Sequence, residues 1–103
     1  MPKYLFAYHG GAMPETEEQV AKVMAAWESW YGELGAAIVD GGNPTSVAKT
    51  VTTEGVTDGG GANPVTGYTI LTADSLELAA KLAQGCPILD SGGTVEVAET
   101  IDM

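Results

Sequence analysis

Hydrophobic residues recur along the chain with two periods, and these periods predict where its strands and helices lie. Near the N-terminus, the segment KYLFAY puts Tyr4, Phe6 and Tyr8 on one face of a strand and Leu5 and Ala7 on the other. A strand that is open to water on one face alternates more cleanly between apolar and polar residues. The pattern therefore predicts a first strand, residues 3–8, that is covered on both of its faces.

A helical period follows this strand. Thr16 and Gln19 have the spacing of a capping box, and the acidic residues around them complement the helix dipole. Apolar residues then recur every three or four positions: Val20, Val23, Met24, Trp27, Trp30, Tyr31 and Leu34. The spacing predicts a helix over residues 17–34, about 27 Å long at 1.5 Å per residue. Gly35 is its expected end, and we expect Trp27 and Trp30 to be largely buried against a sheet.

A second unit of strand and helix occupies residues 67–85. Residues 68–73 are rich in β-branched and aromatic side chains and carry apolar residues on both faces, as a buried strand does. Asp74 lies three residues before Glu77, which predicts that Asp74 is the N-cap of the next helix. Gly85 is expected to end that helix with a positive φ.

The remaining segments complete the order of elements. Short strands are expected at residues 36–40, 46–53 and 94–98, with a brief returning strand at 56–57 and an irregular loop over 58–67. The order is β-α-β, a hairpin, and β-α-β. It predicts an α+β, ferredoxin-like β-α-β-β-α-β fold, with an antiparallel sheet and two helices on one face. The length of 103 residues favours one domain, residues 1–103.

Two helices cover only one face of such a sheet. Because residues 3–8 and 68–73 carry apolar side chains on both faces, the other face would otherwise leave a large apolar patch in water. A second copy of the same sheet is the simplest cover, and a closed two-fold pair is the commonest oligomer. We therefore expect a homodimer in which the two sheets face each other.

Composition excludes several classes of function. The formal net charge is -10, from 14 acidic residues against four lysines and no arginine, so no basic patch is available for nucleic acid. No apolar run approaches the roughly 20 residues that span a bilayer, and nothing resembles a signal peptide. Cys86 is the one cysteine, which fits a reducing, cytoplasmic location. No metal-ligand spacing, Walker A motif or dinucleotide fingerprint occurs, so we expect no metal and no cofactor.

Several segments together resemble the YCII-related, or DGPF-type, domain family of dimeric α/β-barrel proteins. In chain order these are Lys3-Tyr4-Leu5, Ala26-Trp27, Trp30-Tyr31, Leu34-Gly35, Val39-Asp40-Gly41-Gly42, Gly67-Tyr68, Ala79, Ala83, Cys86-Pro87 and Gly92-Gly93-Thr94-Val95-Glu96-Val97. The resemblance covers nearly the whole chain. It implies a ferredoxin-like subunit, a dimer whose sheets face each other, and a pocket between sheet and helices.

The same resemblance bears on function. Most such proteins have no assigned role, some relatives are suggested to be small enzymes with a His–Asp pair, and some resemble domains associated with sigma factors. The family's DGPF signature would fall at Asp58-Gly59-Gly60-Gly61, which keeps Asp-Gly but has no Pro-Phe. A function tied to that segment therefore does not transfer.

His9 is the one residue whose side chain is suited to proton transfer near neutral pH. It precedes Gly10-Gly11 at the end of the first strand, and Asp40 or Asp58 is a candidate to orient it. Two functions follow. One is a dimeric module that binds a small neutral ligand or a protein, and the other is a small enzyme with His9 as general base, oriented by Asp40 or Asp58. The first is favoured because only one residue of catalytic type can be named.

Overall fold

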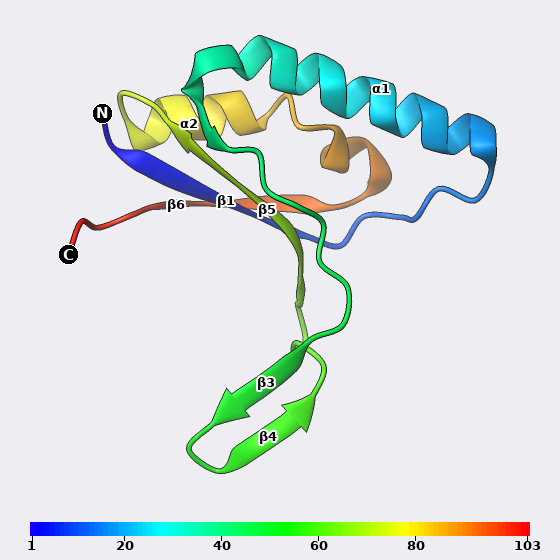
Figure 1. Cartoon of the computed structure of the whole chain (residues 1–103), viewed down its shortest axis with the longest axis vertical. Coiled ribbons are helices and arrows are strands. Elements are labelled where there is room, and N and C mark those ends of the chain that lie inside the picture. The colour runs from blue at the N-terminus through cyan, green and yellow to red at the C-terminus, as the bar shows by residue number, and fades with distance from the viewer.

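The computed structural model describes residues 1–103 and contains six strands and two α-helices (Figure 1). In chain order they are β1 (Lys3–His9), α1 (Glu17–Leu34), β2 (Ile38–Asp40), β3 (Lys49–Thr52), β4 (Gly55–Asp58), β5 (Val65–Thr72), α2 (Leu76–Ala83) and β6 (Thr94–Glu99). Short 3-10 turns precede β2, at Gly35–Ala37, and β6, at Pro87–Ser91.

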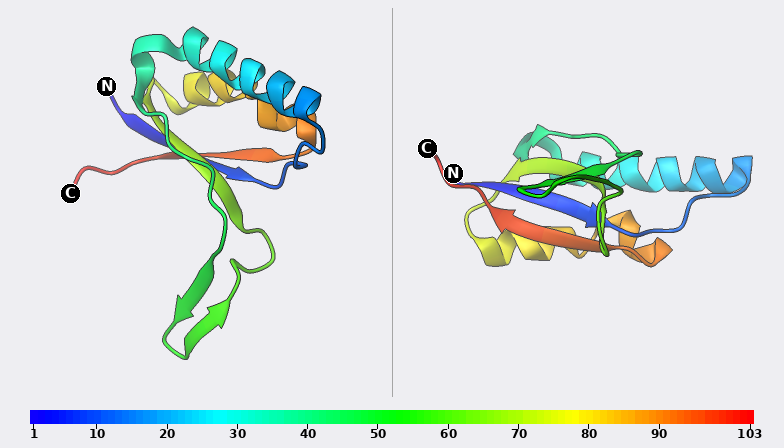
Figure 2. Two further views of the ribbon diagram at one scale, coloured as in Figure 1. Left: turned by 45° about the vertical axis from the view of Figure 1, so that its right-hand side comes forward. Right: turned by 90° about the horizontal axis from the view of Figure 1, so that it is seen from below.

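Four of the strands form one antiparallel sheet in the order β2-β5-β1-β6. Both α-helices lie on the same face of this sheet, as Figures 1 and 2 show. This is the ferredoxin-like α+β arrangement that the pattern of the sequence predicts. Strand β5 begins at Val65, earlier than expected, so the irregular loop before it is shorter than the predicted one.

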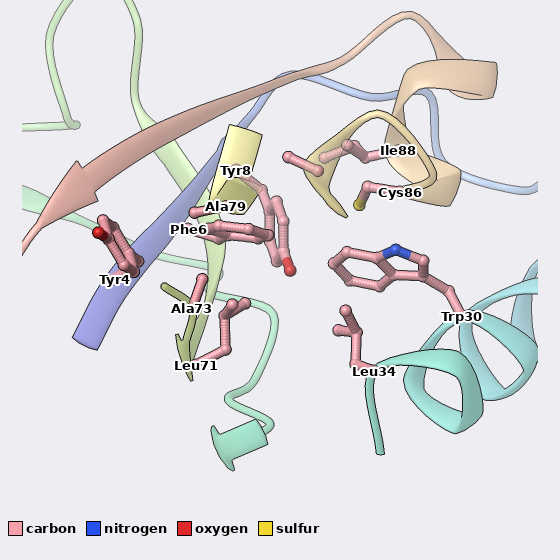
Figure 3. Packing of buried hydrophobic residues seen from close by; sticks show 11 residues of the cluster. Tyr4, Phe6, Tyr8, Trp30, Leu34, Leu71, Ala73, Ala79, Cys86 and Ile88 are labelled. Carbon is pink, nitrogen blue, oxygen red and sulfur yellow. The ribbon is translucent and has the colours of Figure 1, made fainter. Parts of the chain in front are cut away.

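The core lies between the sheet and the helices (Figure 3). Its buried side chains come from alternate positions of the two central strands, as predicted, and from the helices and the turn after α2: Tyr4, Phe6, Tyr8, Trp30, Leu34, Leu71, Ala73, Ala79, Ala83, Cys86 and Ile88. The ring of Trp30 stacks on Phe6, with centroids 6.2 Å apart, and its indole nitrogen donates to the carbonyl oxygen of Leu82. The side chain of Trp30 thus joins α1 to both the sheet and α2.

Helix α1 has the predicted bounds, but only its C-terminal half is buried. The hydroxyl of Thr16 accepts a hydrogen bond from the backbone of Gln19, and Gly35 ends the helix with φ 54°. Trp30 is 4% exposed, whereas Met24 is 58% exposed and Trp27 is only partly buried. Trp27 is thus less buried than Trp30, but its ring packs on Tyr8 of the sheet, the side that the helical period predicts. The N-terminal end of α1 reaches beyond the strands of the sheet (Figure 1), and Val20, Val23 and Met24 in this half are exposed.

The ends of α2 differ from the prediction. Its N-cap is Ser75, whose hydroxyl accepts a hydrogen bond from the backbone of Leu78, and not Asp74. Gly85 does not have a positive φ, because α2 ends through Gln84 in the right-handed region. A Cβ at position 85 would lie 3.3 Å from the indole ring of Trp30. Gly85 is thus explained by the space that Trp30 occupies and not by a helix cap.

Strands β3 and β4 form a separate two-stranded hairpin. Figures 1 and 2 show that it projects from the sheet on the side opposite the helices. The radius of gyration is 14.8 Å, compared with about 13 Å for a compact domain of 100 residues. The hairpin is therefore not folded back onto the rest of the chain.

Candidate functional site

The sheet face that the helices leave open is mainly apolar. Leu5 and Ala7 of β1 are in register with Ile70 and Tyr68 of β5, and Ala98 of β6 lies beside Leu5. All five side chains are half-buried, because neighbouring side chains shield them from the sides while no helix covers them. A carboxylate is costly to bury. Among the β5 and β6 partners of Leu5 and Ala7, one residue is acidic, Glu96, so the centre of this face can be covered at little electrostatic cost.

His9 lies at the end of this open face and is 7% exposed. Its Nε2 is 3.1 Å from a carboxylate oxygen of Glu96. Its Nδ1 is 3.1 Å from the carbonyl oxygen of Asn63 and 3.2 Å from that of Pro64. The imidazole therefore connects the end of β1 with β6 and with the segment that leads from the hairpin into β5.

All three partners of the His9 ring are hydrogen-bond acceptors. A neutral imidazole has one N–H, so it can donate on one side only, whereas the doubly protonated ring can donate on both sides. A general base needs a free lone pair within reach of its substrate. In this arrangement both ring nitrogens face protein groups. Glu96, which is 68% exposed along its side chain, is the partner that can move away without disturbing the backbone.

The carboxylates named from the sequence lie elsewhere. The Oδ1 atom of Asp40 accepts a hydrogen bond from the backbone N–H of Gly42, at 2.9 Å. The carboxylate of Asp58 is paired with the ammonium of Lys49, 2.6 Å away on the hairpin. The structure therefore brings neither of them to His9, and the carboxylate beside the ring is that of Glu96.

Sequence reasoning missed Glu96 because its contact with His9 depends on the register between β1 and β6. The alternation of Val95 and Val97 with Glu96 does place this carboxylate on the face opposite the core. His9 pairs with Thr94, and Ala7 pairs with Glu96. Residues 87 positions apart are thus diagonal neighbours, and local patterns carry no signal for such a pairing.

A chain of hydroxyl groups lies on the other face, beneath α1. Tyr8 donates to the hydroxyl of Thr69, at 2.7 Å, and Thr69 donates to the carbonyl oxygen of Gly41. Tyr31 of α1 donates to the same carbonyl, at 3.1 Å. Burial raises the pKa of Tyr8. The residue after Gly41 must also be glycine. Gly42 has φ 75°, and a Cβ at this position would overlap the backbone carbonyl of Tyr68.

Cys86 belongs to the same buried region and is not placed to act as a nucleophile. It is 2% exposed, and burial raises the pKa of its thiol to about 11. The thiolate is the reactive form of cysteine. At neutral pH the side chain is a small, neutral core group.

A groove of about 510 Å³ runs along the helix-covered side, between α1 and α2. Its walls include Trp30, Leu34 and Leu82, and its polar groups include Glu33 and Lys81. The volume falls within the range of small-molecule sites. Trp30, Leu34 and Ala73 line this groove and belong to the core on the helix-covered face. The groove and His9 therefore lie on opposite sides of the sheet.

No group of three or more His, Cys, Asp or Glu side chains is arranged to hold a metal ion. None of the helices combines the length and the apolar character that crossing a bilayer requires.

The fold has a counterpart among solved structures. The chain is similar to 5-chloro-2-hydroxyhydroquinone dehydrochlorinase from Burkholderia phenoliruptrix AC1100, solved in complex with 2,5-dihydroxybenzoquinone, with a TM-score of 0.56. The likeness covers 96% of this chain and 95% of that chain at 20% sequence identity, which shows a common fold. No protein-family model and no curated protein matches the chain.

Proposed function

We propose that the chain is a YCII-related protein of one domain that forms a homodimer through the open face of its sheet and holds a small neutral ligand between the two sheets. The observation that carries this proposal is the open face itself. Its central residues, Leu5, Ala7, Tyr68 and Ile70, are apolar or aromatic and have no cover from their own chain. An exposed apolar face of this kind marks an interaction surface.

The charge distribution supports a second copy as the cover. The chain carries a formal net charge of -10, so two copies repel each other unless the contact surface is poor in acidic groups. The centre of the open face meets this condition, because Leu5, Ala7, Tyr68 and Ile70 carry no charge. Its acidic groups lie on the two outer strands: Glu96 of β6, beside His9, and Asp40 of β2, which is in register with Ile70.

The polar groups at the end of the open face favour a neutral, partly aromatic ligand. Tyr68 offers an aromatic surface, and Glu96 offers an exposed hydrogen-bond acceptor beside His9. An anionic ligand has no arginine to bind it anywhere in the chain. The complex of the similar dehydrochlorinase with 2,5-dihydroxybenzoquinone suggests dihydroxylated quinones as the first compounds to test.

A small enzyme is the second candidate, and the His9–Glu96 pair is the observation that favours it. If Glu96 turns away from Nε2, that nitrogen is free to accept a proton while Nδ1 still donates to the carbonyls of Asn63 and Pro64. His9 would then be a general base on a neutral, partly aromatic substrate. Chloride release from a chlorinated hydroxyhydroquinone, lost in His9→Gln, would support this candidate over the binding module.

Sedimentation velocity tests the homodimer. At low micromolar concentration, the wild-type protein should sediment with twice the chain mass of 10.6 kDa. Ile70→Asp places a charge on the open face and should give a folded monomer. Met24→Asp adds the same charge at an exposed position of α1 and should remain a dimer. A wild-type monomer at this concentration would contradict the proposal.

Thermal shift measurements test the ligand, because a compound that binds the native state raises the melting temperature. A set of neutral dihydroxylated quinones and hydroquinones should contain a stabilising compound. Glu96→Gln should lose the shift, and Lys81→Gln, in the groove between α1 and α2, should keep it. The reverse result would place the ligand in that groove, and no shift with any compound would contradict this ligand class.

A further inference from the structure

The β3–β4 hairpin is the part of the molecule with the least support from its own chain. Every residue of its two strands is exposed except Thr50, which is half-buried. An isolated two-stranded hairpin is only marginally stable in water. We therefore expect the hairpin to be stabilised by contact with a surface of another molecule.

The two faces of the hairpin differ in chemistry. Val51 and Val56 are directly opposite each other across the strands and are 74% and 61% exposed. Thr50 and Thr57 form a pair on the other face, where the hydroxyl of Thr50 donates to the carbonyl of Gly59. One face thus carries the exposed valine pair next to the Lys49–Asp58 ion pair, and the other carries hydroxyls with hydrogen-bond partners.

The root of the hairpin is held firmly. The backbone N–H of Thr45 donates to the carbonyl of Thr66, and that of Gly59 donates to the carbonyl of Ala48. The ring of His9 lies against the carbonyls of Asn63 and Pro64. The hairpin is therefore positioned at its base as an extension of the sheet, while its tip is bare.

The hairpin projects on the side where the sheet is open, as both views in Figure 2 show. With seven residues in β1, strand rise and spacing give four paired strands a footprint of about 23 by 19 Å, or roughly 440 Å². A stable interface takes about 800 Å² from each partner. The planar footprint of the sheet is thus smaller than this accessible area, and the hairpin is the element placed to add contact area to it.

We infer that the β3–β4 hairpin is an arm that lies against a second copy of the chain, with Val51 and Val56 facing that copy. The inference rests on the proposed homodimer. In the two-fold pair each subunit gives one arm and receives one. The arm adds apolar area at the periphery of the stacked sheets, and it brings Thr50 and Thr57 outward to the solvent.

Two variants with the same change of charge at adjacent positions test the arm. Val56→Asp alters the apolar face and Thr57→Asp alters the hydroxyl face, so both carry the same loss of strand propensity. In sedimentation from submicromolar to about 100 µM protein, Val56→Asp should raise the dimer dissociation constant at least about tenfold. Thr57→Asp should change it less than about threefold, below 0.7 kcal/mol.

Cleavage by trypsin gives a second readout. The chain has four lysines, and Lys49 lies in the hairpin. In the wild-type protein and in Thr57→Asp, cleavage after Lys49 should slow as protein concentration rises and the arm becomes covered. In Val56→Asp it should stay fast over the same range, with cleavage after Lys22 in α1 as the internal reference.

The outcomes separate the arm from the dimer. A wild-type dimer whose dissociation constant is unchanged in Val56→Asp would overturn the arm and leave the stacked sheets in place. Equal weakening by Val56→Asp and Thr57→Asp would also overturn it, because the two faces would then be equivalent. A wild-type protein that stays monomeric at every concentration would overturn both proposals together.

Discussion

The two faces of the sheet are made from the same strands but have different environments. On the helix-covered face, Phe6 and Leu71 are fully buried, and the ring of Trp30 from α1 stacks on Phe6 (Figure 3). On the open face their chain neighbours Leu5 and Ile70 are equally apolar but only half-buried. The comparison shows that alternation along a strand assigns residues to two faces without saying what covers each face. The helices of the same chain cover one face, and in our proposal a second copy of the chain covers the other.

Removing the indole of Trp30 should have the largest effect on the helix-covered face. Trp30→Ala deletes a buried ring and its hydrogen bond to the Leu82 carbonyl, so it should lower the free energy of unfolding by about 3–5 kcal/mol. Trp27→Ala, in the same helix but partly exposed, should cost at least about 1 kcal/mol less. Urea denaturation at one fixed protein concentration measures both, and equal costs would contradict the difference in burial.

Leu71 and Ile70 compare the two faces at adjacent positions of β5. Leu71→Ala should cost about 3 kcal/mol at any protein concentration, because the helices of the same chain cover this side chain. The cost of Ile70→Ala should rise with protein concentration, since its cover comes from a second copy. Thermal unfolding over a concentration series measures the two dependences. An Ile70→Ala cost that is independent of concentration would remove the distinction between the faces.

Cys86 should make the stability of the helix-covered face depend on alkaline pH. Burial raises its pKa from 9.0 to about 11, so between these values the folded thiol keeps its proton while the unfolded one ionises. The folded state then binds more protons, and stability falls as pH rises. The free energy of unfolding of wild type relative to Cys86→Ala should decrease from pH 8 to 11. A difference that does not change with pH would contradict the burial of the thiol.

The smallest expected effects compare single hydrogen bonds on the two faces. Tyr8→Phe removes a buried bond to Thr69, 2.7 Å long, and should cost about 1 kcal/mol. Glu96→Gln removes the charge from a mainly exposed partner of His9 and should cost at most about 0.5 kcal/mol. Chemical denaturation of the two variants measures the contrast. A larger cost for Glu96→Gln would show that the His9 bridge contributes more to stability than the buried hydroxyl chain does.

Local patterns were sufficient to predict the elements of the fold. The capping box of Thr16 with Gln19 and the stop at Gly35 give α1 its bounds, because caps and helix ends are decided by neighbours in sequence. The α2 cap shows the limit of this reasoning. Asp74 and Ser75 are both good N-cap residues, and the helix begins after Ser75, whose hydroxyl accepts from Leu78.

The sequence by itself thus determined the order of elements, the two-sided character of β1 and β5, and the position of His9 at the end of a strand. Only the tertiary structure decided which carboxylate lies beside His9, because the β1–β6 register joins residues that are 87 positions apart. It also decided that α1 is buried only near Trp30 and that the hairpin projects without support. Periodicity describes one element at a time, whereas burial and contact depend on where a second element ends and on what lies beneath it.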